Sequence, residues 1–120
     1  MIRQDQPTCF PSELLVSVSS SSDGTMLDRT LGETHHSRVV AHRRAFCQVS
    51  GAAYADVVYQ RVVYGASRSY DQLCEVDSGA TTRHTAEVVA DGLVTRSPGV
   101  GLLLPVADCV ATVLYDPVQR

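Results

Sequence analysis

Apolar side chains recur at helical spacing in the first half of the chain. Val39, Phe46 and Val49 follow one another at steps of about seven and three residues, which places them on one face of a helix. Thr34 is suited to cap the start, because its hydroxyl can accept a backbone N–H bond. Gly51 is suited to end it, because glycine enters the left-handed conformation without steric cost. The pattern predicts a helix from Thr34 to Gly51.

Short runs of β-branched, aromatic and other apolar residues predict strands over much of the remaining chain. Polar segments rich in serine, threonine and glycine separate them and predict loops. The last two runs are almost continuously apolar, which is typical of strands covered on both faces of a sheet. One helix among several strands predicts a mixed α/β (α+β) fold, with a mixed sheet flanked by helices. The expected strands cover residues 14–18, 56–65, 70–76, the surroundings of Leu93, 102–106 and 110–115.

The two ends of the chain differ in character. Residues 1–13 are polar, contain two prolines and lack periodicity, so we expect a flexible tail. Residues 14–120 are long enough for one domain with its own core. Residues 110–115 predict a strand, but after Asp116 and Pro117 only three residues remain to receive it. We therefore expect residues 14–120 to be the N-terminal portion of a single domain that is incomplete at its C-terminus.

Charge and composition exclude several classes of partner. The net charge is −3 and the isoelectric point is about 5.7, so nothing favours nucleic acid or an anionic membrane. A small neutral or polar ligand fits better. The apolar runs are too short for a signal peptide or a membrane span, which predicts a cytoplasmic protein. The four cysteines form no C-x-x-C pair, so we expect separate reduced thiols. The sequence does not indicate the oligomeric state.

Cys109 is the strongest candidate for chemistry. It follows Asp108 at the end of an apolar strand, where side chains open into the crevices that bind ligands. A thiolate at this position could act as a nucleophile or as a soft metal ligand, with Asp108 orienting a partner. The alternative is a small buried apolar residue, the usual role of an isolated cysteine between valine-rich runs.

The helix carries weaker candidates. Arg43 and Arg44 lie in the middle of the helix, and one of them should flank the apolar face, where a guanidinium could hold a phosphate or carboxylate by two-point contact. A surface arginine with a buried stem is the alternative. His35 and His36 are adjacent and point about 100° apart on a helix, so they are poorly placed to chelate one ion. His84 lies in a polar loop.

Five segments together resemble the laccase-domain family, also called YfiH-like or polyphenol-oxidase-like proteins. Four of them lie close together near the C-terminus, in the same order as in the family. The helix segment is similar to a family segment that contains an Asn-Arg pair, with His42 in place of the asparagine and Arg43 retained. The segments are Val-Val-Ala-His-Arg-Arg-Ala-Phe at 39–46, Ala-Asp-Gly-Leu-Val-Thr at 90–95, Ser-Pro-Gly-Val at 97–100, Val-Ala-Asp-Cys at 106–109 and Leu-Tyr-Asp-Pro at 114–117.

The resemblance implies a mixed α/β fold shared with some cysteine-hydrolase-like toxins. It also implies one zinc ion held by two histidines and a cysteine, with copper as the older assignment. Family members act on purine nucleosides, cleaving adenosine or inosine with phosphate and deaminating adenosine. Zinc with an open position can supply hydroxide, while phosphate requires a cationic hold.

The resemblance also assigns roles to single residues. Cys109 takes the position of the metal-binding cysteine, and Arg43 that of an arginine serving phosphate or nucleoside. The first histidine belongs to a Gln-Val-His-Gly-like segment, where this chain has Tyr64 before Gly65. The second belongs to a segment expected after residue 117. The chain therefore resembles a truncated, divergent member that lacks two of the three ligands.

Two functions remain open at this point. One is a zinc-dependent purine nucleoside phosphorylase and adenosine deaminase, with purine nucleoside and phosphate as its small-molecule partners, inactive as the chain stands. The alternative is a non-catalytic domain that binds a nucleoside or another partner, in which Tyr64 marks a lost metal site.

Overall fold

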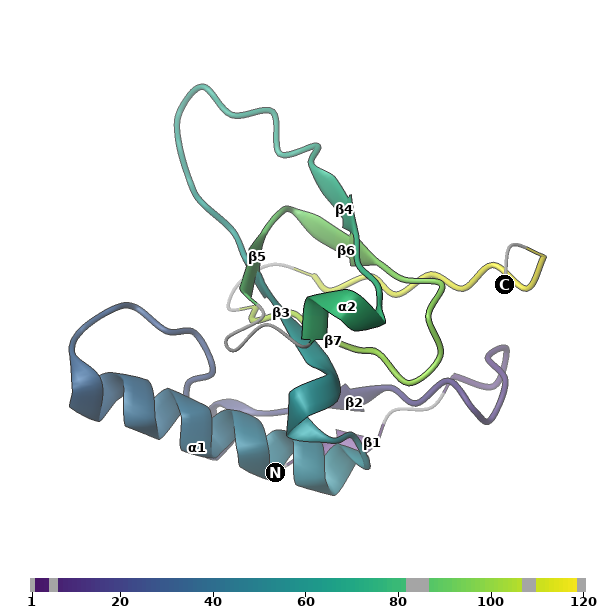
Figure 1. The fold of residues 1–120 in the computed structure, drawn as a ribbon, viewed down its shortest axis with the longest axis horizontal. Coiled ribbons are helices and arrows are strands. Elements are labelled where there is room, and N and C mark those ends of the chain that lie inside the picture. Colours follow the sequence, from purple (N-terminus) through teal and green to yellow (C-terminus); the bar gives the residue numbers. More distant parts are fainter. Residues whose placement is uncertain (1, 5–6, 82–86, 107–109, 119–120) are drawn as a thin grey trace. The chain divides into compact units, whose positions relative to one another are not determined.

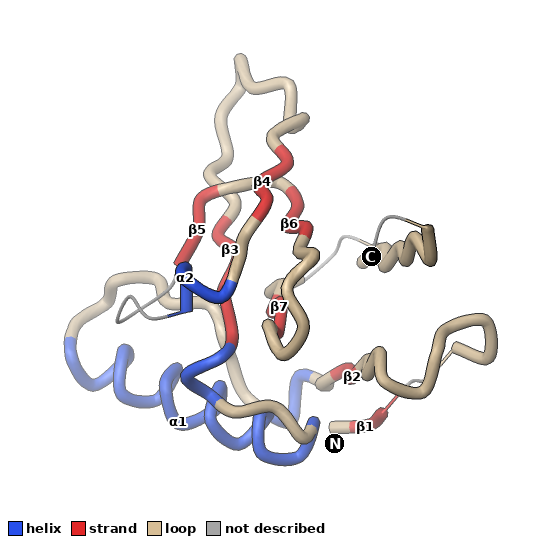
Figure 2. Tube along the Cα trace, turned by 45° about the vertical axis from the view of Figure 1, so that its right-hand side comes forward, coloured by secondary structure: helices blue, strands red, loops and turns tan. Residues whose placement is uncertain are grey.

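The structure is a computed structural model, and it describes residues 2–4, 7–81, 87–106 and 110–118. The chain divides into two compact units, residues 1–54 and 55–120. Together the units contain helices and small sheets, most of them parallel, which confirms the mixed α/β class. Figures 1 and 2 show the order of these elements.

The first unit is built around α1, Glu33–Ser50. Three further elements precede it: an antiparallel pair of short strands and a 3₁₀ turn, η1, at Ser21–Asp23. The strands are β1, Arg3–Gln4, and β2, Ser17–Val18, with Arg3 opposite Val18. Residues 1–13 were expected to form a tail without regular structure, but two of them form β1. A two-residue strand has no periodicity to detect, so only its pairing with β2 defines it.

The ends of α1 differ in how well the sequence predicts them. Gly51 adopts a φ of +80° directly after the helix. Its N–H donates to the carbonyl of Gln48, and the N–H of Ala52 donates to that of Cys47, which is the bonding of a Schellman motif. The predicted end is confirmed. The predicted cap at Thr34 is wrong, because the helix starts one residue earlier, after Gly32, with no side chain capping it.

The buried stripe of α1 also differs from the predicted apolar face. Val39, Arg43, Cys47 and Ser50 are buried at steps of four, four and three residues. Val49, predicted to be on the inner face, is 54% exposed. The cause is that Arg43, a charged residue, occupies an inner position that an apolar pattern does not include.

The second unit is organised by β3, Val57–Arg61, which follows a 3₁₀ turn, η2, at Tyr54–Asp56. β3 pairs in parallel on one side with β5, Glu87–Val89, and on the other with β7, Gly101–Leu103. The first four residues of β3 are buried, as expected of a central parallel strand covered on both faces. Its predicted extension to residue 65 is wrong, because residues 62–72 leave the sheet as a loop.

A second parallel pair lies beside this loop. β4, Leu73–Glu75, pairs with β6, Gly92–Val94, with Cys74 opposite Leu93. Figure 2 shows the two strands next to each other. Both were predicted. The short helix α2, Ser78–Thr81, and β5 were not predicted, and they occupy the segment assigned to a polar loop and its continuation.

The strand predicted at residues 110–115 is absent. These residues are described but belong to no strand, and Val110 and Leu114 are 91% and 89% exposed. An apolar run becomes a strand only when another strand satisfies its backbone groups, and no described residue pairs with this one.

Candidate functional site

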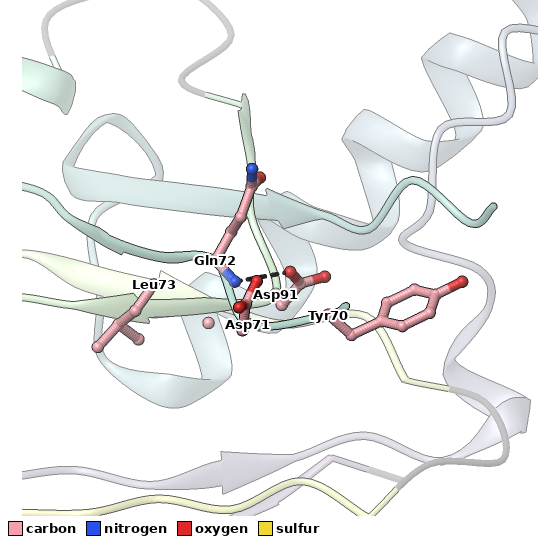
Figure 3. Close-up of a pocket in the computed structure, with 6 residues that line it drawn as sticks. Tyr70, Asp71, Gln72, Leu73 and Asp91 are labelled. Carbon is pink, nitrogen blue, oxygen red and sulfur yellow. Dashed lines mark hydrogen bonds between the residues drawn. The ribbon is translucent and has the colours of Figure 1, made fainter. Parts of the chain in front are cut away.

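Asp91, between β5 and β6, anchors the loop at residues 62–72. Its carboxylate accepts two bonds from Nη2 of Arg68, at 3.1 Å to Oδ1 and 2.9 Å to Oδ2. The backbone N–H of Gln72 donates a third bond to Oδ2 at 2.9 Å (Figure 3). The side chains of Arg68 and Asp91 are 22% and 12% exposed, so this ion pair is largely shielded from water. Arg68, in the middle of the loop, and Gln72, at its end, are thereby tied to one carboxylate.

The backbone of Asp91 is fixed from the sheet side. Its carbonyl accepts a bond from Nε2 of Gln60, a buried residue of β3, at 2.9 Å. Its N–H, and that of Gly92, donate to the carbonyl of Gln72 at 2.8 and 3.1 Å. The buried amide of Gln60 therefore has a partner, and the central strand is connected to the loop.

Tyr70 holds the other end of the loop. Its hydroxyl accepts a bond from the N–H of Gly65 at 3.0 Å and donates to the carbonyl of the same residue at 3.1 Å. The guanidinium carbon of Arg68 lies 5.0 Å from the centre of the Tyr70 ring, within cation–π range. Tyr70 has a φ of +52°, a conformation that bulky side chains rarely adopt.

Tyr64 is more exposed than Val63 and Tyr70, its neighbours in the loop. Its ring centre lies 6.2 Å from that of Tyr70 at an angle of 48°, and its side chain is directed to solvent, with 75% exposure. Arg68 Nη1 also donates a hydrogen bond to the carbonyl of the preceding residue, Val63. Tyr64 is also the residue that the family resemblance places where a metal-binding histidine is expected.

A shallow hollow of about 250 Å³ opens at the C-terminal end of the loop. In Figure 3 the Tyr70 ring and Leu73 point to opposite sides of the two carboxylates, Asp71 and Asp91. Asp71 accepts a bond from the hydroxyl of Ser69 at 2.6 Å. The hollow presents carboxylate oxygens and one aromatic ring, which suits a small polar ligand with hydrogen-bond donors. Its lining residues are Tyr70, Asp71, Gln72, Leu73, Asp91 and Gly92.

Arg43 lies in the first unit, at the middle of α1. It is 5% exposed, and its Nε donates to the carbonyl of Met26 at 2.8 Å. This bond ties the preceding loop to the helix. The expected role in binding phosphate or nucleoside stays a prediction, as does that of Cys109, which lies outside the described residues together with Asp108.

The described residues do not fit a zinc or copper ion. Within the described ranges, no three His, Cys, Asp or Glu side chains come together at one point. The histidines of the first unit have other partners. His35 Nε2 accepts a hydrogen bond from the N–H of Arg29, and His36 Nδ1 lies 2.6 Å from Oδ2 of Asp28. His42 Nδ1 is hydrogen-bonded to the carbonyl of Thr25. A tyrosine is also a poor ligand for zinc at neutral pH.

The anchoring residues were missed from the sequence. Asp91 was noted only as part of a motif, and Arg68 not at all. The two are far apart along the chain, and neither lies in a periodic pattern. The positive φ of Tyr70 leaves no sequence signal either, because asparagine or glycine would be expected there.

Comparison with known proteins supports the resemblance. The model of the family described as multi-copper polyphenol oxidoreductase laccase matches residues 20–120. No curated protein and no solved structure matches the chain significantly. None of the described helices has the length and apolar character needed to cross a membrane. Because the match covers most of the sequence, the chain belongs to the multi-copper polyphenol oxidoreductase laccase family.

Proposed function

We propose that this protein binds purine nucleosides at the loop formed by residues 62–72. The observation that carries the proposal is the exposed ring of Tyr64, held beside Tyr70 at the position where the family resemblance implies a ligand of the active-site metal. The resemblance implies that a residue at that position lies near the nucleoside, because the metal acts on the bound substrate. A tyrosine ring there offers a flat apolar surface to a purine base.

The surroundings of Tyr64 suit such a ligand. Stacking of a nucleobase on an aromatic side chain contributes about 1–3 kcal/mol, largely independently of the base. The carboxylate of Asp71, in the neighbouring hollow, can accept bonds from ribose hydroxyls or an exocyclic amine. The hollow, at about 250 Å³, is slightly smaller than the roughly 300–1,000 Å³ of typical ligand pockets. It therefore suits part of a nucleoside, with the base resting outside it.

The catalytic version of the proposal is phosphorolysis and deamination of purine nucleosides in the cytoplasm. It is favoured by the family match and by Cys109 at the position of the metal-binding cysteine, with Arg43 as the candidate for phosphate. Bound zinc would supply the activated water for deamination. Tyr64 argues against a complete ligand set. We expect the 120-residue chain to bind zinc weakly and to show no measurable phosphorolysis.

Titration of the 120-residue chain with inosine and with adenosine tests the proposal. We expect saturable binding that Tyr64→Ala weakens about tenfold, equivalent to about 1.4 kcal/mol. Tyr54→Ala is the matched control, because Tyr54 also lies against an arginine, with the Arg44 guanidinium carbon 4.2 Å from its ring centre. The control should leave the affinity unchanged. Absence of saturable binding, or equal effects of the two substitutions, would contradict nucleoside binding at Tyr64.

A second assay separates binding from catalysis. Release of hypoxanthine from inosine is measured with phosphate and zinc present, for the unchanged chain and for Cys109→Ser. We expect no turnover in either. Turnover that is lost in Cys109→Ser would contradict the expectation that this chain is inactive, and would support catalysis that depends on Cys109.

A further inference from the structure

The backbone on both sides of Tyr64 is held by side chains from further along the loop. On the N-terminal side, the carbonyl of Val63 accepts a bond from Arg68 Nη1. On the C-terminal side, both polar groups of Gly65 are bonded to the Tyr70 hydroxyl. The peptide units flanking Tyr64 therefore have fixed partners, although the ring between them is three-quarters exposed.

The holding residues are in turn attached to the sheet. Arg68 is bound through two hydrogen bonds by Asp91, and Asp91 is bound through its carbonyl by Gln60 of β3. Gln60 is 4% exposed and lies in the central strand. A continuous series of hydrogen bonds thus runs from the buried strand to the residues next to Tyr64.

The conformation of Tyr70 indicates that this arrangement has a role beyond packing. A tyrosine at a φ of +52° is disfavoured, and such residues persist only where the surrounding contacts determine the backbone. They occur preferentially at ligand clamps and active sites. Here the disfavoured backbone turns the Tyr70 hydroxyl onto Gly65, next to Tyr64.

An exposed ring gains little stability from being held in place. Holding the backbone that carries it does lower the entropic cost of binding a ligand, because that segment is already ordered before the ligand arrives. We infer that Arg68, Tyr70 and Asp91 are positioning residues that preorganise Tyr64 as a stacking surface for a planar base. The identity of the ligand rests on the proposed function, whereas the ordering of Tyr64 does not.

Tyr70→Phe tests the inference, because it removes only the hydroxyl that bonds Gly65. The first measurement is ¹⁵N relaxation at Tyr64 and Gly65. We expect order parameters near the rigid value of about 0.85 in the unchanged chain and below about 0.6 in the variant. Tyr54→Phe, which alters a tyrosine of the first unit, should leave both values unchanged. Unchanged order at Gly65 in Tyr70→Phe would overturn the inference.

The second measurement is the dissociation constant for inosine in a double-mutant cycle. Tyr70→Phe should raise it about threefold to tenfold in the unchanged chain, and should have no further effect when Tyr64 is already alanine. An equal effect in both backgrounds would mean that Tyr70 supports the fold generally, and would overturn the positioning role. Arg68→Lys, which keeps the charge but cannot bond Asp91 and the Val63 carbonyl through two separate nitrogens, should behave in the same way.

The two measurements distinguish this inference from the proposed function. If inosine does not bind but Tyr70→Phe mobilises Tyr64 and Gly65, nucleoside binding is wrong and the ordering of Tyr64 stands without a base as ligand. If inosine binds and Tyr70→Phe changes neither order nor affinity, nucleoside binding stands and the positioning role is wrong.

Discussion

Asp91→Asn should destabilise the second unit by about 2 kcal/mol. The substitution preserves the shape of the side chain but removes its charge and replaces one acceptor oxygen with an N–H₂ group. Three hydrogen bonds currently end on the carboxylate, two from Arg68 and one from the N–H of Gln72. In the variant, the new N–H₂ group faces at least one of these donors, Arg68 or the N–H of Gln72, and that hydrogen bond is lost.

The magnitude follows from burial. Removing a hydrogen bond to a charged group costs about 1.5–3 kcal/mol. The two side chains of the pair are 22% and 12% exposed, so screening by solvent reduces the effect only modestly. The bonds share one carboxylate and do not add, which places the estimate towards the lower end, at about 2 kcal/mol. In a cycle with Arg68→Gln, the coupling between the two residues should be about 1–2 kcal/mol.

Urea unfolding followed by circular dichroism measures this loss. The midpoint should fall while the slope of free energy against denaturant stays constant, because the area exposed on unfolding does not change. Asp71→Asn is the control, since Asp71 is an exposed carboxylate in the same hollow and should change stability by less than about 0.5 kcal/mol. A loss below about 0.5 kcal/mol for Asp91→Asn, or an equal loss for Asp71→Asn, would refute the anchoring role.

Three further predictions concern other parts of the chain. Gly51→Ala should cost about 1 kcal/mol in thermal or urea unfolding, because alanine is strained at a φ of +80°; an unchanged midpoint would contradict this. The hydrogen bond from His36, followed by that from the N–H of Thr30, lowers the pKa of Asp28 below its usual 3.8. The stability contributed by ionised Asp28 is therefore complete above pH 3.8 and is lost as the pH falls further. Asp28→Asn should make the free energy of unfolding depend less on pH below 3.8. An unchanged pH dependence would contradict a contribution from Asp28. If residues 64 and 109 share a pocket, Tyr64→His should raise zinc affinity about tenfold or more, measured by competition with a chelator. No gain in a folded variant would show that the two residues do not share a metal site.

Local signals predicted the elements that depend on local chemistry. Gly51 ends α1 because its bonding motif needs only the residues just before it. β3 was recognised because a buried central strand is continuously apolar, although its end at Arg61 was not. β5 escaped prediction because it is three residues long and is defined by pairing with β3.

The candidate site was harder to predict than the fold. Tyr64 was identified only through resemblance, since an exposed tyrosine has no signature of its own. The bond between Arg68 and Asp91 joins residues from different loops, and a single sequence does not indicate which arginine meets which carboxylate. Arg43 shows the same limitation, because its buried position depends on the carbonyl of Met26.

The parallel arrangement around β3 has a consequence for how the protein is made. Val57 pairs with Gly101, and Tyr59 with both Glu87 and Leu103, so every partner of the central strand is translated well after it. At about 5–20 residues per second, the emerging strand waits for seconds before it can be covered. Such non-local pairing also slows folding itself. During that interval the sequence Val-Val-Tyr-Gln-Arg-Val-Val-Tyr is exposed as a β-prone segment. Its single charge, Arg61, is then its only intrinsic protection against aggregation, and chaperone demand during synthesis should rise when that charge is removed.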